Sequence, residues 1–156
     1  MKILVVDDNK DDAALIVKSL GELAEETTIS ETGEAAINEL QNGQYDCVIL
    51  DYMLPDMSGL EVLQHIRDSG NQSPILFVTG CDDKIIATKS IQSGAQNYFP
   101  KDNIQDETEL FWECVQHTAN LEYMEATARL SLITAQIALI NKKIDAIRTP
   151  KFDAIS

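Results

Sequence analysis

The sequence has few basic residues and no long apolar run. Lys and Arg number 12 against 26 Asp and Glu, so the formal net charge of the 156 residues is −14. Such a chain repels phosphate backbones and anionic lipids, and we expect it to bind neither nucleic acid nor a membrane through charge. No stretch approaches the roughly 20 apolar residues that a membrane span requires. The first apolar run is short and ends in two aspartates, unlike a secretory signal, which indicates a cytoplasmic protein.

Cysteines are also scarce, and they lack the spacing of a metal site. Cys47, Cys81 and Cys114 are an odd number, and the first two lie in or beside apolar runs. We expect buried free thiols rather than a disulfide or a zinc site, and therefore a reducing compartment.

Glycine and proline are absent from residues 105–148. The gap indicates helix, but one unbroken helix would be about 66 Å long at 1.5 Å per residue, which is longer than one domain can cover. Its first part, residues 110–115, should pack on the rest of the fold. Its later part carries apolar residues at alternating spacings of three and four, namely Leu130, Ile133, Ile137, Ile140, Ile144 and Ile147.

The first hundred residues alternate short β-rich runs with helical patterns. We expect strands over residues 2–6, 27–30, 47–50, 74–78 and 96–99, and helices over residues 10–24, 34–41, 58–68 and 82–92. Such alternation is typical of an α/β fold with parallel strands and right-handed crossovers. We therefore predict a flavodoxin-like, doubly wound five-stranded parallel sheet in the order 2-1-3-4-5, plus a long C-terminal helix.

Four strand ends carry side chains that can handle a phosphoryl group. Asp7 and Asp8 follow the first strand, Asp51 the third, Thr79 the fourth and Lys101 the fifth. The first and third strands are neighbours in the predicted order, so three carboxylates meet. Their repulsion favours a divalent cation, and Mg²⁺ prefers carboxylate oxygens. One carboxylate can then attack phosphorus, while an ammonium and a hydroxyl bind the phosphoryl oxygens.

Each residue has a plainer interpretation when it is taken alone. Asp7 and Asp8 could cap the first helix, and Asp51 could begin a turn. Thr79 could be a turn former and Lys101 a solvated surface lysine. The combination at four strand ends that the fold brings together favours the phosphoryl site.

This pattern resembles the receiver domain of two-component response regulators, over about residues 1–120. The resemblance is carried by Asp7-Asp8 after a strand, Leu50 to Gly59 (LDYMLPDMSG), Val78-Thr79-Gly80, Gly94-Ala95 and Tyr98 to Lys101 (YFPK). It implies that a histidine kinase or phosphotransfer protein phosphorylates Asp51. It assigns Mg²⁺ binding to Asp7, Asp8, Asp51 and the backbone carbonyl of Met53. It assigns phosphoryl contact and switching to Thr79, Lys101 and the aromatic Tyr98.

A second interpretation is a Mg²⁺-dependent phosphatase or dehalogenase-like hydrolase with an aspartate nucleophile. Those enzymes place the nucleophile after the first strand, with a second aspartate two residues further on. Asn9 holds that second position here, and Asp51 follows the third strand. We therefore expect a signalling phosphoacceptor rather than an enzyme.

We divide the chain into a receiver domain, residues 1–120, and a helical extension, residues 121–156. The extension shows no helix-turn-helix pattern and no basic patch, so we expect output through protein contacts rather than DNA binding. Its heptad favours a coiled coil, with a homodimer as the first expectation. Two alternatives are a turn near residues 117–121 that folds the tail back onto a receiver, and a linker to an output domain.

Overall fold

A five-stranded parallel sheet in the order β2-β1-β3-β4-β5 forms the centre of the computed structural model, which describes residues 1–80, 84–120 and 126–148. The strands are β1 (Lys2–Val6), β2 (Glu26–Ser30), β3 (Cys47–Asp51), β4 (Ile75–Thr79) and β5 (Asn97–Pro100). Both the predicted fold class and the predicted strand order are confirmed.

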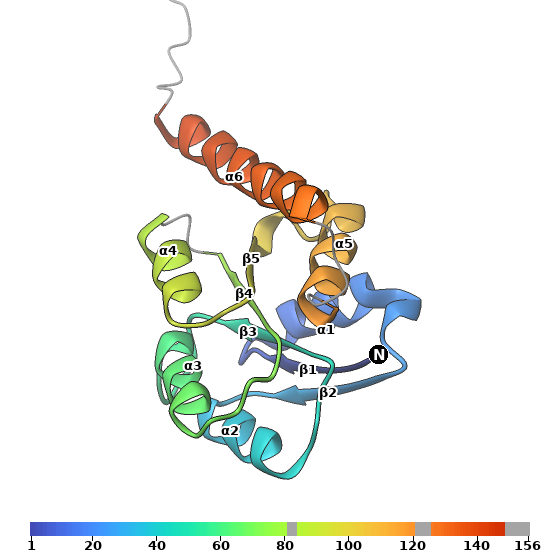
Figure 1. The fold of residues 1–156 in the computed structure, drawn as a ribbon, viewed down its shortest axis with the longest axis vertical. Coiled ribbons are helices and arrows are strands. Elements are labelled where there is room, and N and C mark those ends of the chain that lie inside the picture. The colour runs from blue at the N-terminus through green and yellow to red at the C-terminus, as the bar shows by residue number, and fades with distance from the viewer. Residues whose placement is uncertain (81–83, 121–125, 149–156) are drawn as a thin grey trace, which may run out of the picture.

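Helices cover both faces of this sheet. Figure 1 shows α1 (Lys10–Leu20) and α5 (Thr108–Ala119) on one face, and α2 (Gly33–Asn42), α3 (Gly59–Asp68) and α4 (Lys84–Gln92) on the other. Two short 3₁₀ turns follow α1 and β5, at Gly21–Leu23 and Lys101–Asn103. Every residue of β3 and β4 is buried, as expected for central strands of a parallel sheet with two covered faces.

Side-chain caps hold the first turns of α2 and α3, which begin beside the carboxyl end of β3. Ser58 caps α3 and exchanges hydrogen bonds with Glu61 in a capping box. Asp56 accepts bonds from the first two amides of α2, at 2.9 Å each. The loop after β3 is thereby tied to two helices, which fixes the end of the strand that carries Asp51.

Gly59 packs against the end of β3 without room for a side chain. Its amide donates to the carbonyl oxygen of Tyr52 at 2.7 Å. A Cβ atom at Gly59 would lie 2.1 Å from the carbonyl oxygen of Asp51 and 3.0 Å from the Cα of Tyr52. The glycine therefore allows α3 to begin directly beside the predicted phosphoryl site.

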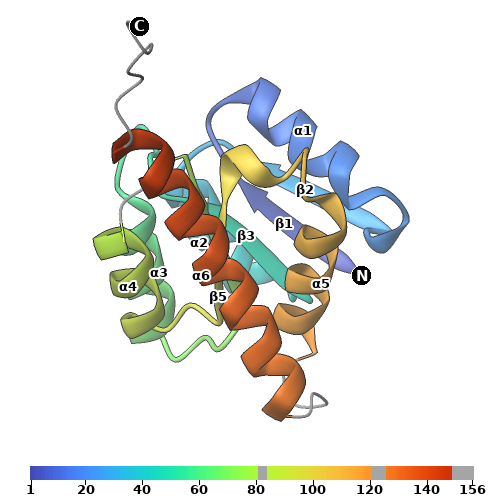
Figure 2. The ribbon, with the colours of Figure 1, turned by 90° about the horizontal axis from the view of Figure 1, so that it is seen from above.

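The C-terminal part contains two helices rather than one unbroken helix, and the predicted long C-terminal helix is present as the second of them. α5 ends at Ala119, and the amide of Asn120 bonds to the carbonyl of Gln116. A second helix, α6 (Ala126–Arg148), returns across the molecule over β5, between α4 and α5 (Figure 2). Residues 121–125 of the predicted helix lie outside the described residues.

Helix α6 packs on residues 1–120 of its own chain, which corresponds to the fold-back alternative. Leu132 and Leu139 are buried in the same core cluster as residues of α1, α5 and the sheet. Between them, Gln136 donates to the carbonyl of Tyr98 at 2.5 Å and contacts the sulfur of Cys114 at 3.1 Å. Because β5 is an edge strand, its backbone groups need partners outside the sheet, and Gln136 supplies one.

Cys47 and Cys114 are buried free thiols, as predicted, whereas Cys81 lies outside the described residues. Burial raises the pKa of the Cys47 thiol to about 12, so this group is inert at neutral pH. Within the part of the chain that the structure describes, none of the helices has the length and apolar character needed to cross a membrane.

Candidate functional site

Asp7, Asp8 and Asp51 meet at the carboxyl edge of the sheet. β1 and β3 are neighbours with Val6 opposite Leu50, so the residues that follow end side by side. One oxygen from each of the three carboxylates lies within 4.8 Å of the others. Asp7 and Asp51 are buried, while Asp8 is exposed. The predicted acidic cluster is therefore present, with one side open to solvent.

Backbone amides orient the two buried carboxylates. The amide of Asn9 donates to Oδ1 of Asp7, and the amide of Tyr52 donates to Oδ1 of Asp51, both at 2.9 Å. The Oδ2 atom of each carboxylate faces Lys101. Its Nζ lies 2.6 Å from Oδ2 of Asp7 and 3.2 Å from Oδ2 of Asp51.

The plainer interpretation of Asp7 and Asp8 as helix caps is wrong. Asn9 is the N-cap of α1, and its side chain accepts from the amides of Asp11 and Asp12. Lys101 is likewise no solvated surface lysine, because 12% of its side chain is exposed and it forms three ion pairs.

The third partner of Lys101 was not among the predicted site residues. Asp12, in the first turn of α1, places Oδ2 3.0 Å from Nζ of Lys101. Helical spacing gave no signal for Asp12, because Asp8 precedes Asn9, the N-cap of α1, and so lies outside the helix. The significance of Asp12 depends on how α1 lies against β5, which no sequence pattern specifies.

Thr79, Met53 and Tyr98 take different places around the cluster. Thr79 is the buried last residue of β4, one position beyond the Asp51–Val78 pair of the sheet register. Met53 forms an isolated antiparallel bridge with Ser58, and its side chain is 71% exposed. Tyr98 lies on β5, away from the carboxylates.

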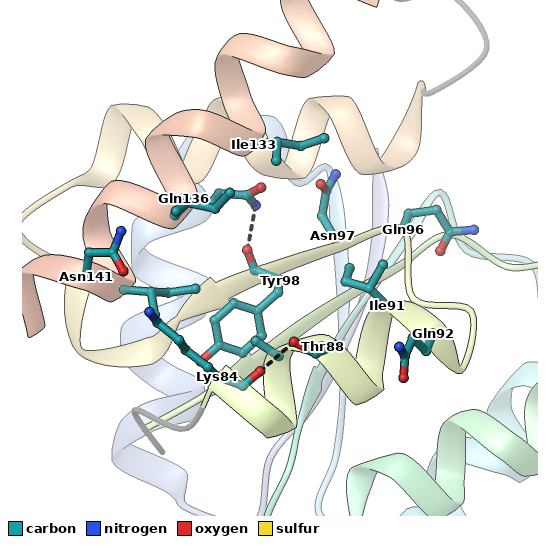
Figure 3. A pocket seen from close by; sticks show the side chains of 13 residues that line it. Lys84, Thr88, Ile91, Gln92, Gln96, Asn97, Tyr98, Ile133, Gln136 and Asn141 are labelled. Atoms are coloured by element: carbon teal, nitrogen blue, oxygen red, sulfur yellow. Dashed lines mark hydrogen bonds between the residues drawn. The ribbon is translucent and has the colours of Figure 1, made fainter. Parts of the chain in front are cut away.

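The ring of Tyr98 is buried beside a groove between α4, β5 and α6 (Figure 3). The groove has a volume of about 500 Å³, and its lining combines the apolar side chains of Ala87, Ile91, Ile133, Ile137 and Ile140 with polar ones from the same elements. Tyr98 therefore forms part of the wall of the groove to which α6 contributes.

Burial and neighbouring charge shift the acid–base behaviour of the site. Burial, together with the carboxylate of Asp7, raises the pKa of Asp51 to about 6, although Lys101 and the Tyr52 amide act in the other direction. Burial alone would lower the pKa of Lys101, but its carboxylate partners outweigh burial and raise it. Lys101 thus stays charged, and Asp51 is ionised at neutral pH at a cost to the fold.

The residues present fit a magnesium ion. Three carboxylates, with oxygens close enough to share one cation, form a hard-oxygen donor set of the kind that Mg²⁺ takes. Burial and the neighbouring Asp7 carboxylate raise the pKa of Asp51, so negative charge on this group is costly. A divalent ion at these oxygens would remove that penalty.

The Asp51→Asn variant is expected to be more stable than the wild type at pH 7.5 without divalent cations. The folded-state pKa of Asp51, about 6, lies above its ordinary value of 3.8, so the ionised carboxylate disfavours folding above pH 6. A neutral amide should therefore raise the free energy of unfolding by about 2–3 kcal/mol. Near pH 4, where Asp51 is protonated in the folded state, the difference should shrink. Urea denaturation in EDTA at both pH values measures it, and equal stabilities at pH 7.5 would contradict the prediction.

The chain matches the response regulator receiver domain family over residues 3–111. The uncharacterized transcriptional regulatory protein YrkP of Bacillus subtilis is 38% identical over 106 residues, which make up 68% of this chain and 45% of that protein. The transcriptional regulatory protein DltR of Streptococcus agalactiae is 34% identical over 107 residues, 69% of this chain and 48% of that protein. The chain spans about half the length of these curated relatives.

Solved structures show the same likeness. A CheY-like receiver domain protein of Methanospirillum hungatei matches with a TM-score of 0.64 and 25% identity, over 75% of this chain and 94% of that chain. The response regulator DrrB of Thermotoga maritima matches with a TM-score of 0.65 and 28% identity, over 78% of this chain and 53% of that chain. On its fold, its acidic cluster and these relatives, the chain belongs to the receiver-domain family of two-component response regulators.

Proposed function

We propose that Asp51 accepts a phosphoryl group from a histidine kinase or phosphotransfer protein, and that the chain then signals through protein contacts. The observation that carries this proposal is the position of the Asp51 carboxylate. It lies at the end of β3, oriented by a backbone amide, beside two further carboxylates and 3.2 Å from the Lys101 ammonium. This is a carboxylate nucleophile with a cation partner in place.

In the proposed reaction an Asp51 oxygen forms a bond to phosphorus while the bond from phosphorus to the donor breaks. Mg²⁺, held by Asp7, Asp8, Asp51 and the backbone carbonyl of Met53, would neutralise charge on the phosphoryl oxygens. Lys101 would bind a phosphoryl oxygen through Nζ, and Thr79 another through its hydroxyl. Tyr98 would act as the switch residue, because it links β5 to the groove beside α6.

Incubation with acetyl phosphate and Mg²⁺ tests the proposal. Intact-mass measurement should show one phosphoryl group per chain, and the label should need Mg²⁺. A Mg²⁺-dependent hydrolase would instead turn over many equivalents of a small ester such as p-nitrophenyl phosphate. Ester turnover without a stable label would overturn the proposal in favour of the hydrolase. We propose that the chain is no enzyme beyond its own labelling and loss of label, and that it works in the cytoplasm.

We also propose that the helical extension, residues 121–156, forms a homodimer through the apolar stripe of α6 that lies beside its contact with the receiver, residues 1–120. Four heptad side chains remain largely uncovered: Leu130 is 65% exposed, Ile133 47%, Ile137 51% and Ile147 69%, whereas Ile140 packs against the core. Apolar stripes of this length seldom face water in a stable monomer. Leu132, Gln136 and Leu139 hold α6 on its own receiver, whereas the exposed parts of the stripe remain available to a second copy, so both contacts can occur together.

The Ile137→Asp variant should be a monomer at concentrations where the wild type sediments as a dimer, because a charge at the centre of the stripe cannot be desolvated. Ser131→Asp adds the same charge at an exposed position beside the stripe and should leave the dimer intact. Sedimentation velocity over a concentration series measures both. A wild type that stays monomeric throughout would contradict the dimer.

Protein output is favoured over DNA output by the net charge of −14. The curated relatives carry the name transcriptional regulator, and each extends well beyond the region it shares with this chain. Direct DNA binding by this chain would need a basic surface, and its excess of acidic side chains opposes one.

A further inference from the structure

Lys101 forms an ion pair with a carboxylate outside the acidic cluster, in addition to two within it. An ammonium has three N–H donors, and three carboxylates surround this one. Their Oδ2 atoms lie 2.6 Å (Asp7), 3.0 Å (Asp12) and 3.2 Å (Asp51) from Nζ. Asp7 and Asp51 belong to the candidate metal cluster, but Asp12 does not.

Asp12 reaches Lys101 from a separate element. It lies in the first turn of α1, and its backbone amide is held by the Asn9 side chain at 3.1 Å. Its side chain is 38% exposed, whereas that of Lys101 is 12% exposed. The pair therefore joins α1 to the end of β5 on the solvent side of the cluster.

A cation at the acidic cluster would weaken the attraction of the Asp7 and Asp51 carboxylates for Lys101. Oxygens of Asp7 and Asp51 that coordinate Mg²⁺ are shared with a doubly charged neighbour, which repels the ammonium. The carboxylate of Asp12 remains available, because it lies outside the cluster.

We propose that Asp12 is a positioning residue that holds Lys101 when Mg²⁺ takes Asp7 and Asp51. Held by Asp12, Lys101 keeps one ionic partner and directs its remaining N–H groups toward the phosphoryl group. Without Asp12, Lys101 stays on Asp7 and Asp51 and competes with the metal. The labelling consequence rests on the proposed phosphorylation of Asp51, whereas the metal-binding consequence does not.

An NMR titration with MgCl₂, followed through the backbone amides, tests the assignment directly. Asp12→Asn should weaken Mg²⁺ binding by roughly 5–10-fold, the low end of coupling between neighbouring sites. With acetyl phosphate, labelling at sub-saturating Mg²⁺ should slow by about the same factor, since both effects have one cause. At saturating Mg²⁺ the labelling rate should return to within about twofold of the wild type, because the chemical step keeps all its groups.

Three variants separate positioning from simple loss of charge or of helix stability. Asp11→Asn removes the same charge from the same exposed helix turn and should leave the Mg²⁺ affinity near that of the wild type. Asp12→Glu should restore most of the affinity. In a Lys101→Ala background, Asp12→Asn should have no further effect.

Two results would overturn the assignment of Asp12: equal Mg²⁺ affinities of Asp12→Asn and Asp11→Asn, or an undiminished effect in the Lys101→Ala background. Absence of labelling in the wild type, together with the expected Mg²⁺ shifts, would refute the proposed function while the positioning role stands.

Discussion

The Asp51→Asn variant should take up no label from acetyl phosphate, a loss on the order of 10³-fold or more in labelling rate. The amide has nearly the shape of the carboxylate and can still accept from the Tyr52 amide, so the fold is kept. It has no anionic oxygen to attack phosphorus. Intact mass spectrometry after incubation with acetyl phosphate and Mg²⁺ measures the label.

Asp68→Asn is the matched control for this loss. Asp68 is exposed at the opposite end of α3 from the acidic cluster, where it accepts from the Gln64 side chain. That variant should be labelled like the wild type. Full labelling of Asp51→Asn would show that another carboxylate is the acceptor, and Asp8, the exposed member of the cluster, would be examined next.

Gly59→Ala should destabilise the fold by about 3 kcal/mol or more, as expected of an overpacked buried site. The added Cβ would meet the carbonyl oxygen of Asp51 at 2.1 Å and the Cα of Tyr52 at 3.0 Å. Both are backbone atoms, so no side chain can rotate away to relieve the clash. Either α3 must shift or the end of β3 must move and carry Asp51 with it. Urea denaturation gives the stability, and the acetyl phosphate labelling rate should fall in parallel.

Gly80→Ala provides the contrast at a second glycine near the site. A Cβ there would lie 3.8 Å from the nearest atom, Oδ1 of Asp102, which is an ordinary contact. Its stability and labelling should stay close to those of the wild type. Equal stabilities of Gly59→Ala and Gly80→Ala would show that the start of α3 can adapt.

The strand order and the main cluster could be predicted from the sequence because strand ends are recognisable locally. Asp7, Asp51 and Thr79 each stand where an apolar run stops, and parallel topology brings those positions to one edge. Asp12 could not be found in this way. Its contact with Lys101 depends on the direction in which α1 crosses the sheet, and that direction is decided by packing.

The docking of α6 on its own receiver was an alternative rather than the first expectation, for a related reason. Its sequence carries two apolar faces, and the regular heptad through Ile133 and Ile137 is the more conspicuous. The face that packs on the receiver consists of Leu132, Gln136 and Leu139. A polar amide therefore stands between the two apolar side chains of this face. That amide is buried because the edge strand β5 offers it a backbone carbonyl, a partner that helix periodicity does not reveal.

Two contacts of α6 bracket Lys101 along the chain. Gln136 binds the carbonyl of Tyr98, three residues before it, and Lys143 forms an ion pair with Asp102, the next residue, at 3.2 Å. Coupling free energies between binding sites are reciprocal. If phosphorylation of Asp51 changes the affinity of α6 for a partner molecule by some factor, then binding of that molecule must change the equilibrium constant of phosphorylation by the same factor. The recipient of the signal would thus help to set the fraction of chains that carry the phosphoryl group.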